Sequence, residues 1–92
     1  DGIVASNDEY ATLVLGALLD AGMTVPGDVA VLGSDNSSWG LWMRPALSTI
    51  VLEPGDITDQ LVTALDSIRQ GRPYPDALRL DARMRVIHRQ TT

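Results

Sequence analysis

Two short apolar runs, each closed by a carboxylate and a carboxamide side by side, constrain most strongly what this chain can fold into. Ile-Val-Ala-Ser at 3–6 leads directly into Asn-Asp at 7–8, and Val-Ala-Val-Leu-Gly-Ser at 29–34 leads into Asp-Asn at 35–36. Continuous apolar runs of this length are typical of buried parallel strands. In neighbouring parallel strands both polar pairs lie at one sheet edge, where open α/β sheets bind ligands. The pattern therefore predicts small-molecule recognition.

A helical pattern lies between the two runs, from about Glu9 to Ala21, with Gly22 as a typical helix end. One apolar stripe at helical spacing, expected to face the sheet, is formed by Tyr10, Leu13, Val14, Ala17, Leu18 and Ala21. A second stripe, spaced by four residues, is formed by Ala11, Leu15 and Leu19. A helix on one side of a sheet normally buries one face, so two stripes predict a second burial partner. We favour another subunit over further chain of the same protein.

The rest of the chain continues the alternation of strands and helices. Residues 2–34 form a predicted βαβ unit, whose crossover should be right-handed. After an irregular stretch at 36–47, we expect a strand at 48–52, a helix at about 55–70 and a last extended segment at 78–89. The predicted fold class is therefore α/β, a parallel sheet with flanking helices. Because Asp1 stands inside the first predicted strand, we expect the chain to be part of a longer polypeptide.

Composition excludes several classes of function. The net charge is −5, with seven Arg and no Lys. An acidic surface repels phosphate backbones, so this segment is not expected to touch nucleic acid itself. The absence of Cys excludes disulfides and thiolate metal sites. No apolar run reaches the length of a membrane span, so no membrane partner is expected.

Motifs for catalysis are missing from the sequence. Ser-Ser at 37–38 does not stand in a nucleophile-elbow pattern, and Gly-Ser-Asp at 33–35 is not a glycine-rich phosphate loop. His88 is the single histidine, and metal or acid–base sites usually need a partner group. We interpret the alternating Arg83, Arg85 and Arg89 as a solvated strand edge. We therefore expect no catalytic residue, no metal ligand, no cofactor and no enzyme activity.

The ordered series of motifs resembles the C-terminal third of the LacI/GalR transcription regulators. The resemblance covers nearly the whole chain and is far more specific than any single motif. It rests on Ala-Ser-Asn-Asp at 5–8, the Leu/Ala-rich helix, the run from Ala21 to Asn36, Arg-Pro-Ala-Leu-Ser-Thr-Ile at 44–50, and Met-Arg-Val-Ile-His-Arg at 84–89. Two positions beside the expected pocket depart from the family's pattern: Ser34 replaces a usual bulky residue, and Asn36 replaces a frequent second Asp.

The resemblance implies a two-lobed, periplasmic-binding-protein-like (type I) fold with three αβα layers. Residues 1–47 would belong to the C-terminal lobe, 48–77 would cross to and pack in the other lobe, and 78–92 would return across the hinge. A small-molecule effector, such as a sugar or nucleoside, binds between the lobes in this family. Closure of the cleft then changes how tightly an N-terminal helix-turn-helix domain binds operator DNA. That domain is absent from this chain. The resemblance also implies a cytoplasmic homodimer.

The expected ligand-binding residues are Asn7, Asp35 and Asn36. A carboxamide both donates and accepts, and a carboxylate accepts from two hydroxyls, which suits a sugar or related polyol. Each has a structural alternative: Asn7 could cap the helix, Asp35 could close a turn, and Asn36 could satisfy loop backbone. Asp8, in the first turn of the helix, is expected to interact with the helix dipole instead.

A dimer interface is the expected role of the second helix stripe together with Trp42 and Met43. The resemblance places the dimer contact of the family near these two residues, and Trp is enriched at interfaces. Ala11, Leu15 and Leu19 are the stripe residues assigned to it. For Trp39 two alternatives stay open, which are stacking on a sugar ring and burial at the interface.

Two other functions compete with a ligand-sensing regulator. A sugar-binding protein of a transport system shares the fold, but such proteins are usually monomeric, and residues 44–49 are more similar to the repressors. An enzyme using Asp8 and Asp35 as a carboxylate pair has no nucleophile, metal cluster or phosphate loop to support it. The leading interpretation is a module that binds and switches without catalysing a reaction.

Overall fold

The computed structural model of this chain describes residues 1–53, 55–72 and 83–92 and divides into two compact units. Unit 1 consists of Asp1–Val51 with Arg85–Thr92, and unit 2 is Leu52–Met84. None of the helices within the described ranges has the length and apolar character needed to cross a bilayer. The predicted assignment of residues to two lobes stays a prediction.

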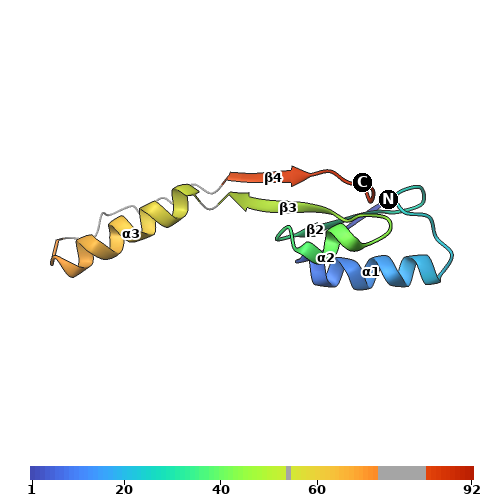
Figure 1. Cartoon of the computed structure of the whole chain (residues 1–92), viewed down its shortest axis with the longest axis horizontal. Helices are drawn as coiled ribbons and strands as arrows, with labels where there is room; N and C mark the ends of the chain where they lie inside the picture. The colour runs from blue at the N-terminus through green and yellow to red at the C-terminus, as the bar shows by residue number, and fades with distance from the viewer. Residues whose placement is uncertain (54, 73–82) are drawn as a thin grey trace. The chain divides into compact units, whose positions relative to one another are not determined.

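A four-stranded sheet with the order β1-β2-β3-β4 organises the chain (Figure 1). Its strands are β1 (Gly2–Val4), β2 (Ala30–Ser34), β3 (Ser48–Glu53) and β4 (Arg83–Ile87). β1 runs parallel to β2 with Ile3 opposite Val31, and β2 runs parallel to β3 with Leu32 opposite Ser48. This confirms the α/β class and the parallel pairing of the first two strands, so their polar ends lie at one edge. The part of the predicted last strand at 78–82 lies outside the described residues.

Helix α1 (Asp8–Asp20) joins β1 to β2 and begins and ends with ordinary capping chemistry. The Asn7 side-chain oxygen accepts from the Tyr10 backbone N–H at 2.9 Å, which satisfies one of the free donors of the first turn. At the other end Gly22 has φ +77°, and its N–H donates to Leu19 O at 3.0 Å. A residue without Cβ adopts this conformation at little cost, as predicted for position 22.

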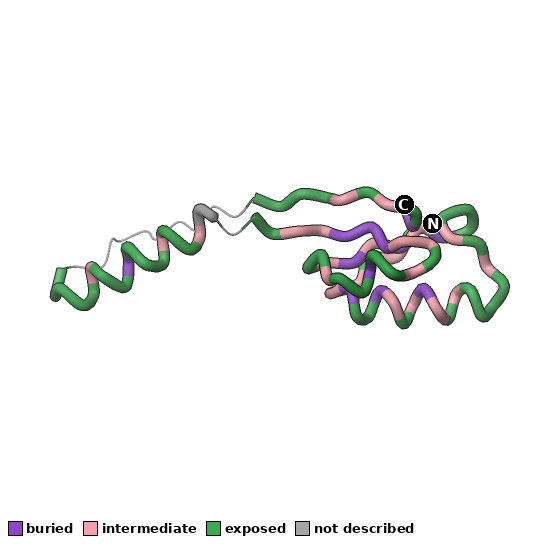
Figure 2. Tube along the Cα trace, viewed as in Figure 1, coloured by how far each residue is buried: buried purple, intermediate pink, exposed green. Residues whose placement is uncertain are grey.

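The face of α1 that packs on the sheet is rotated from the predicted one, of which only Val14 and Leu18 pack, half-buried, against the core. Ala11 and Leu15 are fully buried, and Ala11 forms a core with Val31 and Leu47. Tyr10 and Leu13, predicted to be buried, are 59% and 66% exposed. Figure 2 shows the buried residues recurring along one side of the helix. The prediction of Ala11 and Leu15 as dimer contacts is therefore wrong.

We attribute the rotation of α1 to Asp8. Asp8 is 1% exposed and lies at helical spacing from Ala11 and Leu15, so the three share the buried face. Small residues allow close approach here, since a Cβ on Gly33 would lie 3.2 Å from the Ala11 Cβ. Counting apolar residues therefore misplaced the centre of the buried face, because that face also contains a carboxylate, Asp8.

A short helix, α2 (Ser38–Trp42), lies within the stretch predicted to be irregular. In unit 1, α1 and α2 lie on the same side of the sheet (Figure 1) and contact each other. Gly40 is buried against Leu47, whose N–H donates to Gly40 O at 2.9 Å. The described residues of unit 1 therefore form two layers, and the third layer of the expected αβα arrangement stays a prediction.

The turn before β2 is closed by Thr24 and Asp28. The Thr24 hydroxyl and backbone N–H both donate to Asp28 Oδ2, each at 2.7 Å. The hydrogen bond from the Thr24 hydroxyl, and to a smaller extent the one from the Thr24 backbone N–H, hold the pKa of the Asp28 carboxyl below its ordinary value. Because folding lowers this pKa, the ionised Asp28 carboxyl stabilises the folded state at any pH above the pKa that it has in the unfolded chain. This contribution is lost as the pH falls through the pKa of the folded state.

Unit 2 contains α3 (Gly55–Arg69), in agreement with the helix predicted at about 55–70. Ala64 is 6% exposed, whereas three other apolar residues of the helix are exposed: Leu61, Leu65 and Ile68. Gly71, with φ +67°, follows the helix.

Candidate ligand-binding site

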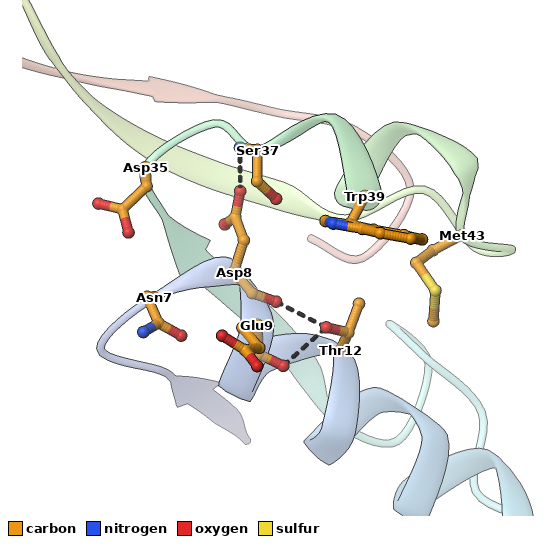
Figure 3. A pocket seen from close by; sticks show the side chains of 8 residues that line it. All are labelled: Asn7, Asp8, Glu9, Thr12, Asp35, Ser37, Trp39 and Met43. Atoms are coloured by element: carbon orange, nitrogen blue, oxygen red, sulfur yellow. Dashed lines mark hydrogen bonds between the residues drawn. The ribbon is translucent and has the colours of Figure 1, made fainter.

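A cavity of about 590 Å³ lies where β1 and β2 end and α1 and α2 begin, within unit 1 (Figure 3). Its lining residues are Asn7, Asp8, Glu9, Thr12, Asp35, Ser37, Trp39 and Met43. Two of the three predicted ligand-binding residues, Asn7 and Asp35, therefore line one cavity from two neighbouring strand ends. Asn36 is not among the lining residues.

Asn7 combines its capping role with a place at the cavity. Its side-chain oxygen accepts a hydrogen bond from the Tyr10 N–H, so Asn7 caps the helix, which was one of its two predicted roles. Among the described residues the amide nitrogen has no partner, and it lies on the same side of the cavity as Asp35 (Figure 3). Capping and ligand contact are therefore compatible in this one side chain, because they use different atoms.

Asp35 is held in an uncommon backbone conformation. Its φ is +96°, which for a residue with a Cβ costs on the order of 1–3 kcal/mol and tends to occur at functional sites. The backbone N–H donates to Ile50 O at 2.8 Å, and the side chain is exposed at the cavity. The carboxylate has no partner among the described residues, so its oxygens can accept hydrogen bonds from a ligand.

Asn36 uses its polar groups within the protein. Its Oδ1 accepts from the Arg89 guanidinium at 2.6 Å, and its backbone N–H donates to Thr49 Oγ1 at 3.2 Å. These contacts give Asn36 a structural role, although the partner of its side chain is Arg89 rather than the loop backbone of the predicted alternative. They also correct the interpretation of Arg89 as part of a solvated edge, since this side chain is half-buried and bonded.

Asp8 connects three elements rather than only one helix end. Its Oδ1 accepts from the Thr49 hydroxyl and its Oδ2 from the Ser37 backbone N–H, both at 2.6 Å. A first-turn position was predicted, but burial was not, because nothing local distinguishes Asp8 from the exposed Glu9. The feature of the sequence that relates to the burial of Asp8 is Gly33, because a Cβ at that position would overlap Asp8 Oδ1.

We expect Gly33→Ala to destabilise the protein by about 1–3 kcal/mol, because the added methyl displaces a buried carboxylate and Leu47. Gly16→Ala is the matched control, since a Cβ on Gly16 meets nothing within 4 Å. Alanine in a helix interior should be neutral or stabilise by up to about 1 kcal/mol. Urea denaturation of the full-length protein compares the two. Equal stability of both variants would contradict the tight contact between Gly33 and Asp8.

Ser37 is a functional candidate that sequence reasoning missed. Its Oγ is buried without a hydrogen-bond partner among the described residues, and it lines the cavity beside Asp8 and Trp39 (Figure 3). Buried hydroxyls are normally satisfied, so an unpartnered one at a cavity wall is a place for a ligand atom or a water. No local pattern indicates this role, apart from the position of Ser37 directly after the second polar pair.

The two tryptophans differ in their relation to the cavity. Trp39 lines it, whereas Trp42 does not, and both are largely exposed, at 74% and 78%. Met43 lines the cavity at the α2 end. Within the described ranges, no group of three or more carboxylate or imidazole side chains is placed to hold a metal ion.

Comparison with known proteins identifies the family. Residues 1–92 match the periplasmic binding protein-like domain family. The lactose operon repressor of Rhizobium radiobacter is 33% identical over 85 residues, which cover 91% of this chain and 74% of that protein. The ribose operon repressor of Bacillus subtilis (strain 168) is 32% identical over 92 residues, which cover all of this chain and 28% of that protein.

A solved structure agrees with this assignment. The LacI family transcriptional regulator from Arthrobacter sp. FB24, in complex with lactose, is 35% identical with a TM-score of 0.78, and the match covers all of this chain. The chain spans 34% of the length of that regulator. With the sheet, the paired strand ends and these relatives in agreement, the chain belongs to the LacI family of transcriptional regulators and forms a C-terminal part of their effector-binding domain.

Proposed function

We propose that this chain senses a sugar or related polyol and passes that signal to a DNA-binding helix-turn-helix domain outside the chain. The observation that carries the proposal is the placement of Asn7 and Asp35, from neighbouring strand ends, on one cavity. The named relatives are lactose and ribose operon repressors, and one relative was solved with lactose. They favour this reading over a transport-system binding protein.

The chemistry of the cavity suits hydroxyl groups. The Asp35 carboxylate can accept from two adjacent hydroxyls, and the Asn7 amide nitrogen can donate to a third. The unpartnered Ser37 Oγ can donate or accept. Trp39 offers an apolar ring face beside these polar groups, and a pyranose has both kinds of surface.

The proposal extends to the arrangement of lobes. Residues 1–47 serve as part of one lobe, 48–77 enter the other, and 78–92 return, so that the effector closes a cleft between lobes. Closure is then the two-state change to which operator binding responds, with an effector that favours one state over the other. The module binds and switches in the cytoplasm and does not catalyse a reaction.

Homodimer formation is part of the proposal, with a corrected set of contacts. Leu19, Trp42 and Met43 remain from the predicted interface. Tyr10 and Leu13 replace Ala11 and Leu15, because they are the exposed apolar residues of α1. The exposed side chains of α1 and α2 together offer an apolar surface of the kind that marks interaction sites.

We expect Trp42→Glu to weaken dimerisation of the full-length protein by about 30-fold or more, as for loss of an interfacial Trp hot spot of about 2 kcal/mol. Trp42→Phe keeps an apolar ring and should remain dimeric. Sedimentation equilibrium measures both variants. An unchanged dimer in Trp42→Glu would place the interface elsewhere, and unfolding of this variant by circular dichroism would disqualify it in favour of Leu13→Glu.

A thermal-shift screen of the full-length protein tests the effector class. The panel contains lactose, cellobiose, galactose, ribose, polyols and nucleosides. A ligand at a hundred times its Kd adds about 2.7 kcal/mol of stability, which is readily detected. Stabilisation by one sugar class supports the proposal, and a panel without any stabilising sugar or polyol would overturn it.

A further inference from the structure

The closing segment of the chain is tied firmly to the starts of β2 and β3. The Thr91 hydroxyl donates to Val31 O at 2.7 Å and accepts from the Ser48 N–H at 2.8 Å, and Thr91 is fully buried. The Gln90 N–H donates to Ala46 O at 2.9 Å. The backbone that carries Arg89 therefore has a defined place within unit 1.

Arg89 spans from this segment to the ligand-site loop. One guanidinium nitrogen donates to Leu47 O and the other to Asn36 Oδ1, each at 2.6 Å. Its backbone N–H donates to Ser48 Oγ at 2.8 Å. Hydrogen bonds from a charged donor are stronger than neutral ones, and two acceptors fix the plane of the guanidinium.

The loop that Arg89 holds is a corner with two successive residues at positive φ. Asp35 has φ +96° and Asn36 has φ +54°. Strained residues persist only when the surroundings hold them. Three contacts do so here: Asp35 N–H to Ile50 O, Asn36 N–H to Thr49 Oγ1, and Asn36 Oδ1 to Arg89.

We propose that Arg89 is a positioning residue for the effector site, which acts through Asn36 to hold Asp35 with its carboxylate at the cavity. The inference rests on the proposed function, since Asp35 is there the effector contact. Neither Arg89 nor Asn36 lines the cavity, so both act without touching the effector. The chain's last segment thereby sets the geometry of a site built from residues more than fifty positions earlier in the sequence.

A double-mutant cycle on the full-length protein tests this link, with Arg89→Gln, Asn36→Ala and the double variant. Calorimetric titration uses lactose first and then the best sugar of the screen. We expect each single variant to weaken binding by about tenfold, and the double variant to be no weaker than the weaker single variant. Losses that multiply in the double variant would show independent action and overturn the proposal.

A measurement without ligand separates this proposal from the proposed function. Hydrogen–deuterium exchange over residues 34–37 should accelerate in both single variants, and should stay unchanged in Arg69→Gln, which removes an exposed arginine of α3. Arg89→Lys, which keeps one charged donor, should give an intermediate rate and replaces Arg89→Gln if that variant does not fold. Unchanged exchange in the Arg89 variants overturns the inference, whereas wild-type protein that binds no sugar overturns the proposed function.

Discussion

Asp35→Gly is expected to weaken effector binding by about a hundredfold, and Asp35→Asn by about tenfold. A hydrogen bond to a charged group contributes roughly 1.5–3 kcal/mol, and a loss of 1.4 kcal/mol is a factor of ten in Kd. Asparagine keeps one acceptor oxygen but loses the charge, so its effect should be the smaller one. Isothermal titration with the sugar found in the screen measures both.

These two substitutions are chosen because alanine would confuse two effects at this position. Asp35 has φ +96°, where glycine is unstrained and asparagine is tolerated better than alanine. Loss of binding in variants that fold as well as the wild type therefore reports on the carboxylate itself. Asp20→Ala, at the exposed end of α1, is the control for general loss of acidic charge. Full affinity in Asp35→Asn and Asp35→Gly would mean that Asp35 only closes the turn.

The positions of the strands and of the two long helices could be predicted because they depend on local patterns, whereas the short helix α2 was not predicted. The apolar runs that precede the polar pairs at 7–8 and 35–36 contain β1 and β2, and Gly22 follows the helix between them. The rotation of α1 could not be predicted in this way. It depends on Asp8 reaching Thr49, a contact between residues 41 positions apart.

The candidate site was predictable to the same extent. Asn7 and Asp35 follow from strand ends that meet at one sheet edge, which is a rule of topology. The roles of Ser37 and Arg89 do not follow from this rule, because they depend on the path of the loop between β2 and α2. In the sequence Arg89 resembled its neighbours Arg83 and Arg85, and its bonds to Leu47 and Asn36 join residues more than forty positions apart, which no local pattern indicates.

Replacement of Asp8 has the largest expected effect on stability. We expect Asp8→Ala to lower the free energy of unfolding by about 3–6 kcal/mol, from two hydrogen bonds to a charged acceptor at roughly 1.5–3 kcal/mol each. The Thr49 hydroxyl and the Ser37 N–H would lose their acceptor, and both contacts lie in or beside the core. Urea denaturation of the full-length protein at neutral pH measures the change.

Glu9→Ala is the matched control, because Glu9 is the adjacent carboxylate in the same first turn but is exposed. If the helix dipole were the main role of Asp8, both variants would lose the same amount, about 0.3–1 kcal/mol. The dipole acts on both carboxylates, whereas burial and bonding between α1, α2 and β3 belong to Asp8 alone. A large difference between the variants therefore identifies Asp8 as the link that sets the rotation of α1. Equal small losses would return Asp8 to a capping role, and the burial of Ala11 and Leu15 would then need another cause.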